Sequence, residues 1–179
     1  AYAGAMAAGL VSMVVRLSVG KKSYQKVEAE LTKILEESES LRAALEAGVK
    51  DDSEAYQNVM AAYKLQKDNP DRPKIIQDAT LTAAVVPLDT ARMIKDVFYL
   101  AIRTAEIGNK NAITDAGTAA NLAYAAINSA AYNVRINLTS LDDQKKKQKM
   151  LKELSSLETS AHESLDKIKE ILTKRGGLF

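Results

Sequence analysis

The sequence predicts an all-α protein, an antiparallel bundle of four to five helices, two of them long. Apolar residues recur at helical spacing along most of the chain, and the alternation of β-branched and aromatic residues that is typical of strands is not found. Three prolines and eight glycines leave few breaks. Aromatic residues make up only 5% and tryptophan is absent, so the core must be built from smaller aliphatic side chains. The length suits one domain, which we expect to span residues 1–179.

The composition excludes several classes of function. A net charge of +2 is too small to indicate a nucleic-acid partner. The absence of cysteine removes thiolate catalysis, disulfides and the usual zinc sites, and it favours a reducing cytoplasm. The single histidine, His162, cannot build a histidine metal cluster or a catalytic relay with a second histidine. No metal site is therefore predicted.

Residues 1–19 are almost entirely apolar and rich in small side chains, which predicts a helix that approaches its neighbours closely. A signal peptide or a membrane span is the alternative interpretation. Ser12 and Arg16 interrupt the run, no basic segment precedes it, and it is shorter than a bilayer requires. We expect a buried core helix and no membrane partner.

Residues 27–63 predict a long helix with one carboxylate on its apolar face. The apolar members of that face are Val27, Leu31, Ile34, Leu41, Leu45, Ala55, Val59 and Ala62. Asp52 lies on the same face, and Tyr56 belongs to a flanking row that widens the apolar stripe, so the Asp52 carboxylate should point into the bundle. A buried ion is costly, which makes Asp52 the first functional candidate. In the alternative, Gly48 ends one helix and Asp52 belongs to the cap of the next.

Two connections flank this long helix. The segment 20–23 closes the first helix, and its Lys21 and Lys22 either satisfy the helix end or hold an anionic ligand tail. The segment 67–73 is polar, contains two prolines and predicts a loop.

Three further helical segments follow. Residues 74–107 have helical periodicity interrupted by Pro87, which predicts either a kinked helix or two helices, and Gly108 with Asn109 supplies a stop. A helix from near Thr114 to residue 138 contains unusually many asparagines for a helix interior. We expect some of them to form hydrogen bonds across the bundle or to a ligand. Residues 143–174 predict the last helix.

Five groups of residues follow one another along the chain: Gly4-Ala5-Met6-Ala7-Ala8 with Ser12-Met13-Val14, Asp52-x-Glu54-Ala55-Tyr56, Val86-Pro87-Leu88, Gly108-Asn109 followed by Thr114-Asp115, and Asn133-Val134-x-Ile136-Asn137-Leu138. Together they resemble the cyclodeaminase/cyclohydrolase family of folate enzymes. The resemblance covers most of the chain. It implies a helical protomer that forms a homodimer and binds a tetrahydrofolate derivative, with no cofactor beyond that substrate.

The resemblance also implies roles for individual residues. Asp52 matches the aspartate that the family requires for ring closure, and Tyr56 of the same motif is expected to contact the substrate. Asn133 and Asn137, one helical turn apart, match the asparagine motif.

A second group of expected site residues comes from the family's Gly-Asn-to-Asp segment. Asn109, Thr114 and Asp115 match it, and Asp115 is expected to orient a proton or stabilise a developing cation. In one respect the sequence departs from the family. A glycine-rich loop of the Pro-Gly-Gly-Gly-Ser type precedes the first helix in the family, and we expect it to be absent here.

The reaction expected first is cyclodeamination. N10 of 5-formimidoyltetrahydrofolate attacks the formimidoyl carbon, ammonia leaves, and Asp52 accepts and returns the proton. Lys21, Lys22 or Lys110 would hold the glutamate tail of the substrate. The alternative is a methenyltetrahydrofolate cyclohydrolase, in which Asp52 activates water and 10-formyltetrahydrofolate forms. A further alternative from another class is a non-enzymatic helical oligomerisation module, which would tolerate Asp52→Leu.

Overall fold

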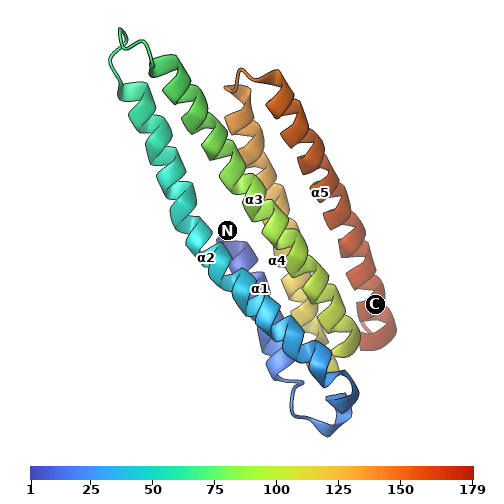
Figure 1. Cartoon of the computed structure of the whole chain (residues 1–179). Helices are drawn as coiled ribbons and strands as arrows, with labels where there is room; N and C mark the ends of the chain where they lie inside the picture. Colours follow the sequence, from blue (N-terminus) through green and yellow to red (C-terminus); the bar gives the residue numbers. More distant parts are fainter.

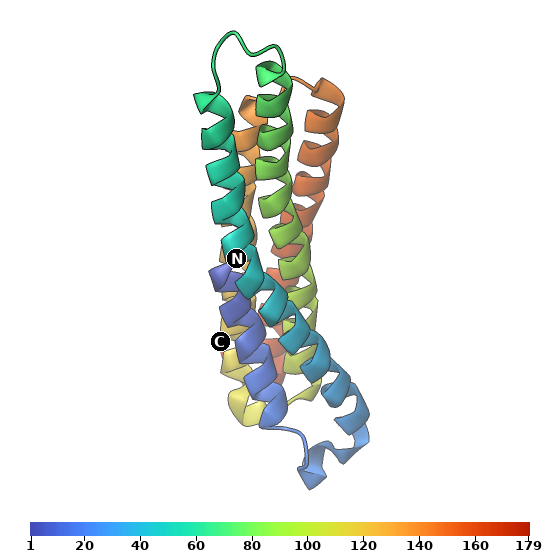
Figure 2. The ribbon, with the colours of Figure 1, turned by 60° about the vertical axis from the view of Figure 1, so that its left-hand side comes forward.

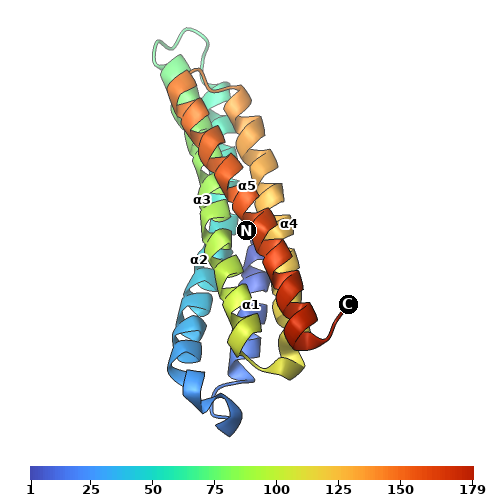
Figure 3. The same cartoon turned by 90° about the vertical axis from the view of Figure 1, so that its right-hand side faces the viewer.

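The computed structural model describes residues 1–179 and contains five α-helices and no strands (Figure 1). The helices are α1 (Tyr2–Arg16), α2 (Glu28–Lys64), α3 (Arg72–Ile107), α4 (Ile113–Thr139) and α5 (Gln144–Ile171). Short 3₁₀ turns, Lys22–Val27 and Lys110–Ala112, precede α2 and α4, and a π-helical turn, Leu172–Gly176, follows α5. Consecutive helices run in opposite directions (Figures 1 and 3), so the predicted antiparallel all-α bundle is confirmed. No helix is both long and apolar enough to span a bilayer.

The sequence left open whether the second and third long helical segments are interrupted, and both are continuous helices in the structure. α2 runs through Gly48 and Asp52 without interruption, so the alternative in which these residues end one helix and cap another is wrong. α3 also stays one helix with Pro87 inside it, and it ends at Gly108 as the sequence predicts. Packing against neighbours on both sides outweighs the local cost of a glycine or a proline within a long helix.

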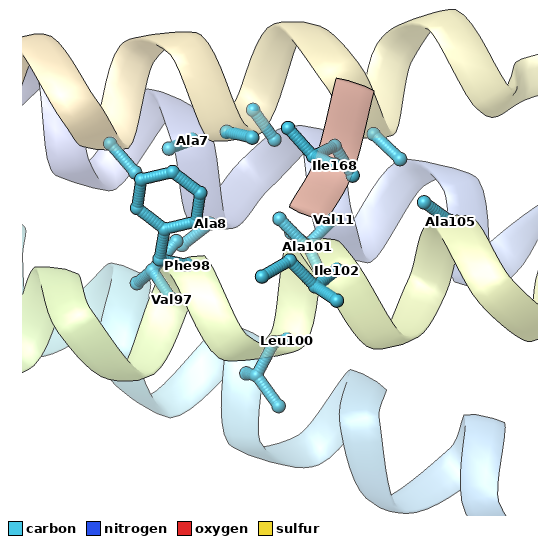
Figure 4. Packing of buried hydrophobic residues seen from close by; sticks show 14 of the residues in the cluster. Ala7, Ala8, Val11, Val97, Phe98, Leu100, Ala101, Ile102, Ala105 and Ile168 are labelled. Atoms are coloured by element: carbon cyan, nitrogen blue, oxygen red, sulfur yellow. The ribbon is translucent and has the colours of Figure 1, made fainter. Parts of the chain in front are cut away.

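The half of the bundle that contains α1 is called the lower half, as it lies in Figure 1. Its core is built from α1, α3 and α4, with contributions from α2 and α5. Phe98 of α3 is the largest fully buried side chain, and it packs among alanines and valines (Figure 4). Ala7 and Ala8 of α1 are completely buried on the same core, so α1 can approach α3 and α4 closely. This confirms the expectation of a buried N-terminal helix.

The upper half has a second, smaller core that contains no residue of α2. Its buried members come from α3, α4, α5 and the α4–α5 connection: Ala84, Leu88, Ala91, Ala130, Ala131, Val134, Leu138, Leu141, Met150, Leu154 and Leu157. In this half the inner face of α2 is covered less completely than in the lower half.

The length of α1 explains this difference. α1 packs against both α2 and α4, but its 15 residues extend only about 22 Å. α2 has 37 residues and extends about 55 Å. Figures 1 and 2 show the N-terminus beside the middle of α2. α1 therefore contributes to the core of the lower half and not to the smaller core of the upper half.

Candidate functional site

Two adjoining cavities occupy the space between α2 and α4 at and beyond the start of α1. The first cavity, of about 290 Å³, is lined by Ala1, Tyr2, Ala3, Gly48, Val49, Asp52, Ser53, Pro87, Thr90, Ala126, Ser129, Ala130 and Asn133. The second cavity, of about 380 Å³, is lined by Asp52, Ala55, Tyr56, Val59, Ala83, Asn133, Ile136 and Asn137. Asp52 and Asn133 line both, so the two cavities form one groove, which we call the α2–α4 groove.

Asp52 lies at the junction of the two cavities, but it is exposed rather than buried. The prediction that its carboxylate points into the packed interior is therefore wrong. The periodicity of α2 correctly places Asp52 on the inner face of the helix. α1 begins beside Asp52, so the inner face of α2 borders the groove at Asp52. Only nearer the N-terminus of α2 does the same face pack into the core. The carboxylate is thus available to a ligand from either cavity.

The asparagines of α4 divide into two kinds of contact. Asn133 Nδ2 donates to the Ser129 carbonyl of its own helix at 3.0 Å, whereas Asn137 Nδ2 donates across the bundle to the Ala83 carbonyl of α3 at 2.7 Å. The expectation that some of these amides bond across the bundle is confirmed for Asn137. Both residues also line the second cavity, so both stay candidates for ligand contact.

Tyr56 lies one turn of α2 beyond Asp52, and its side chain is 65% exposed. Together with Val59 and Ile136 it gives the second cavity an apolar wall. A flat aromatic ring beside aliphatic side chains is a favourable surface for a planar ligand ring. The placement of Tyr56 in the groove agrees with its predicted contact with substrate.

Three hydroxyls of the first cavity were not predicted as site residues: Ser53, Thr90 and Ser129. Each donates to a carbonyl of its own helix four residues earlier, at 3.2, 3.1 and 2.8 Å respectively. Their oxygen lone pairs are left to accept from a ligand. Ser129 precedes Asn133 by one helical turn, and Ser53 follows Asp52 directly, so spacing along the helices could have found both. Thr90 could be placed only after α3 was known to stay continuous beyond Pro87.

Asn109 belongs to the fold rather than to the groove. Its side chain donates from Nδ2 to the Leu17 carbonyl at 2.9 Å, and its Oδ1 accepts from the Asn111 amide at 3.0 Å. The backbone amide of Asn109 donates to Ser18 Oγ at 2.8 Å. Asn109 therefore joins the end of α1 to the α3–α4 connection, and its predicted ligand contact is not supported.

The remaining predicted residues gather at the lower end of the bundle. Lys21 and Lys22 border a shallow cavity of about 240 Å³ at the start of the first 3₁₀ turn. The Tyr24 hydroxyl of that turn accepts a hydrogen bond from the Lys110 amide at 3.1 Å. Thr114 and Asp115 lie directly beyond, in the first turn of α4.

This end of the molecule is far from Asp52. Asp115 and Asn133 are on the same helix, 18 positions apart, which corresponds to about 27 Å. Lys21 follows the far end of α1 and is separated from the groove by the length of that helix. Within one chain, Asp115 is therefore too far from Asp52 to act on the same reacting group. The expectation that Lys21, Lys22 or Lys110 holds the glutamate tail of a substrate bound at Asp52 is not supported within one chain.

No group of three or more acidic or histidine side chains is arranged to hold a metal ion. His162 is exposed, and its ring lies 6.3 Å from that of Tyr124, between centroids. The groove thus offers one carboxylate, amides, hydroxyls and apolar surface. Such a set can move a proton and hold a flat polar molecule.

Comparison with known proteins places the chain in a family. The sequence model described as formiminotransferase-cyclodeaminase matches residues 1–156. The methenyltetrahydrofolate cyclohydrolase of Methylorubrum extorquens is 44% identical over 98% of this chain and 86% of its own length. The formimidoyltransferase-cyclodeaminase of Rattus norvegicus is 27% identical over 88% of this chain, which corresponds to only 30% of that longer protein.

A solved structure agrees with these sequence matches. The crystal structure of formiminotetrahydrofolate cyclodeaminase from Thermotoga maritima superimposes with a TM-score of 0.88 and 36% sequence identity, over 95% of this chain and 83% of that one. The chain therefore belongs to the formiminotransferase-cyclodeaminase family. The family resemblance predicted from the sequence motifs is confirmed.

Proposed function

We propose that this chain is a folate-dependent one-carbon enzyme that forms or opens the methenyl bridge between N5 and N10 of tetrahydrofolate in the α2–α4 groove. The observation that carries the proposal is the position of Asp52, which is the one carboxylate that lines the α2–α4 groove. The chain also belongs to a family of folate enzymes. The cavities are of the size that ligand sites commonly have.

Two reactions fit this site. In the cyclodeaminase reaction, 5-formimidoyltetrahydrofolate closes to 5,10-methenyltetrahydrofolate and releases ammonia, and the Thermotoga relative carries that name. In the cyclohydrolase reaction, 5,10-methenyltetrahydrofolate and water give 10-formyltetrahydrofolate. The higher identity to the Methylorubrum enzyme, over most of both chains, favours this second candidate.

Asp52 has a corresponding role in each reaction. In ring closure, its carboxylate accepts the proton from N10 as N10 attacks the formimidoyl carbon, and then returns a proton to the departing nitrogen. In ring opening, it accepts a proton from the water that attacks the methenyl carbon and later releases it to solvent. The hydroxyl that forms on this carbon then loses its proton to become the formyl oxygen, and N5 takes up a proton as its bond to the carbon breaks. A positioned acid–base group of this kind contributes about 10²- to 10⁴-fold to a rate. A folate in the groove would itself displace water from around the carboxylate.

Exposed apolar side chains support a homodimer. Tyr2, Met6, Met13 and Leu17 recur at helical spacing along α1 and its C-cap, and Tyr132 and Ile136 are exposed on the neighbouring α4, with exposed fractions of 39–71%. We call this surface the α1–α4 face. Covering it with a second copy would remove this apolar area from water and close the side of the groove. A cytoplasmic location stays a prediction from the absence of cysteine.

The proposal is tested by offering the purified chain both substrates. Methenyltetrahydrofolate absorbs in the near ultraviolet, so its absorbance rises when 5-formimidoyltetrahydrofolate is cyclised and falls when methenyltetrahydrofolate is hydrolysed. We expect an enzyme-dependent change with at least one substrate, and its direction identifies the reaction. No change above the uncatalysed rate with either substrate, together with no saturable folate binding, would instead favour the non-enzymatic oligomerisation module.

A further inference from the structure

Pro87 lies in the middle of α3 and lines the first cavity. In a regular helix the amide of residue 87 would donate to the carbonyl of Ala83, four residues earlier. Proline has no amide hydrogen, so it leaves the Ala83 carbonyl without its helical partner. Ala83 is only 6% exposed, and a buried carbonyl needs a hydrogen bond.

Asn137 of α4 supplies that hydrogen bond. Its Nδ2 is 2.7 Å from the Ala83 carbonyl oxygen. A carbonyl can only accept, so the atom that faces it must be the amide nitrogen, and the assignment of Oδ1 and Nδ2 follows from the contact itself. The contact holds the nitrogen toward α3 and turns the planar amide so that Oδ1 is directed away from Ala83.

We propose that Pro87 acts as a positioning residue, which frees the Ala83 carbonyl so that this carbonyl orients Asn137, and that the Asn137 amide oxygen then accepts a hydrogen bond from an N–H group of the folate. This inference rests on the proposed function. It assigns Asn137 two simultaneous contacts, one to α3 and one to ligand. Asn137 and Ala83 both line the second cavity, and Asp52 stands at its other side.

The other polar groups of the second cavity agree with a ligand that donates. Asp52 is an acceptor when ionised, and Asn133 also has its Nδ2 bonded to a backbone carbonyl. A tetrahydropterin with its p-aminobenzoyl group carries several N–H groups along its edges and at N10. The cavity would therefore select reduced folates, which have more N–H groups on the pterin ring, over fully oxidised folate.

The coupling is tested with a double-mutant cycle of Pro87→Ala, Asn137→Ala and the double variant. The probe is 5-formyltetrahydrofolate, a stable reduced folate, and its dissociation constant is measured by calorimetry alongside thermal unfolding of each free protein. Pro73→Ala is the matched control, because Pro73 lies in the first turn of α3, where its missing amide hydrogen leaves no helical carbonyl unpaired.

In the wild-type background we expect Asn137→Ala to weaken binding about tenfold, the worth of one hydrogen bond, and to lower the melting temperature. Pro87→Ala should weaken binding about fivefold without lowering the melting temperature, because the backbone amide that it introduces at position 87 competes with Asn137 for the Ala83 carbonyl. In the double variant that amide replaces the lost contact, so the melting temperature should recover while binding stays as weak as in Asn137→Ala. Pro73→Ala should bind as the wild type does.

Two results would overturn the inference while leaving the proposed function intact. One is unchanged binding by Pro87→Ala. The other is that Pro87→Ala weakens binding of the probe by the same factor in the presence and in the absence of Asn137, which would mean that the proline ring itself contacts the ligand. A wild-type protein that neither binds the probe nor turns over either substrate would instead overturn the proposed function, and the inference with it.

Discussion

Of the two glycines of α1, Gly4 lies closer to neighbouring side chains. A Cβ atom added there would lie 2.7 Å from Ile94 Cγ1 and 3.2 Å from Leu45 Cδ1, both fully buried side chains. Gly9 lies on the same helix under less constraint, since its nearest neighbour would be Arg42 Cδ at 3.6 Å. A comparison of alanine substitutions at the two glycines therefore separates the effect of close packing from that of helix propensity.

We expect Gly4→Ala and Gly9→Ala to change stability in opposite directions. Gly4→Ala overpacks the core and should lower the free energy of unfolding by about 1–3 kcal/mol. Gly9→Ala meets only ordinary contacts and should raise it by about 0.5–1 kcal/mol, because alanine favours a helix. Urea unfolding of both variants measures the difference. Equal effects would mean that Gly4 is not a packing constraint.

At the same scale, the sequence could predict the face of the helix on which Asp52 lies but not the surroundings of its carboxylate. The periodicity of residues 27–63 places Asp52 on the inner face, and this is correct for the helix. Its exposure depends on where another helix, α1, begins, which no local pattern contains. The contact between Asn137 and Ala83 was likewise invisible, although Pro87 does mark Ala83 as the carbonyl that needs a partner.

At the scale of elements, charged pairs connect helices that apolar packing has already brought together. Arg92 of α3 contacts Glu153 of α5 with two hydrogen bonds, Nε to Oε1 at 2.6 Å and Nη2 to Oε2 at 2.8 Å. Arg103 of α3 holds Glu30 of α2 in the same way, at 2.6 and 3.0 Å. The helix boundaries and directions were predictable because helical periodicity and loop residues are local. The partners of these arginines were not, because they depend on the register between helices.

The Arg92–Glu153 pair predicts a pH dependence of stability. The hydrogen bond from Arg92 lowers the pKa of Glu153 in the folded protein, so the pair stabilises the fold above the unfolded pKa, about 4.3. That stabilisation is lost as the pH falls through the lower folded pKa. Because both side chains are partly exposed, we expect less than about 1 kcal/mol at neutral pH.

Thermal unfolding of Glu153→Gln against wild type from pH 7 to pH 3 checks this dependence. The difference in melting temperature should be constant near neutrality and shrink at acidic pH. Glu163→Gln is the control, because Glu163 is exposed and takes part in no ion pair. A difference that grows as the pH falls would contradict the lowered pKa of Glu153.

At the scale of the whole molecule, the groove follows from the mismatch between α1 and α2. α1 packs between α2 and α4 in the lower half, and its first residue, Tyr2, lines the first cavity together with Asp52. The second cavity continues from there and is lined by no residue of α1. Figure 2 shows the N-terminus beside the middle of α2. From the sequence we expected one site that included Asp115 and three lysines. The structure separates these residues from Asp52 by about the length of α1. Asp52 lies beside the start of α1, whereas Asp115 and the lysines lie beyond its other end.

The proposed homodimer gives a prediction at this scale. Met6→Glu places a charge on the α1–α4 face without touching either cavity and should shift the sedimenting mass from about twice 19.4 kDa to the monomer value. Helicity should not change. Tyr99→Glu introduces the same charge at a comparably exposed side chain of α3, outside the α1–α4 face, and should leave the mass unchanged. A wild-type protein that sediments as a monomer would contradict the dimer.

The most direct measurement for the whole account is the turnover number of Asp52→Asn with the active substrate, compared with wild type under saturating conditions. Asparagine keeps the size and the helix position of Asp52 but cannot take up a proton. We predict a loss of at least about 10²-fold in turnover with unchanged helicity and with saturable folate binding retained. Turnover equal to that of the wild type would contradict the central claim that the carboxylate in the α2–α4 groove performs the proton transfer.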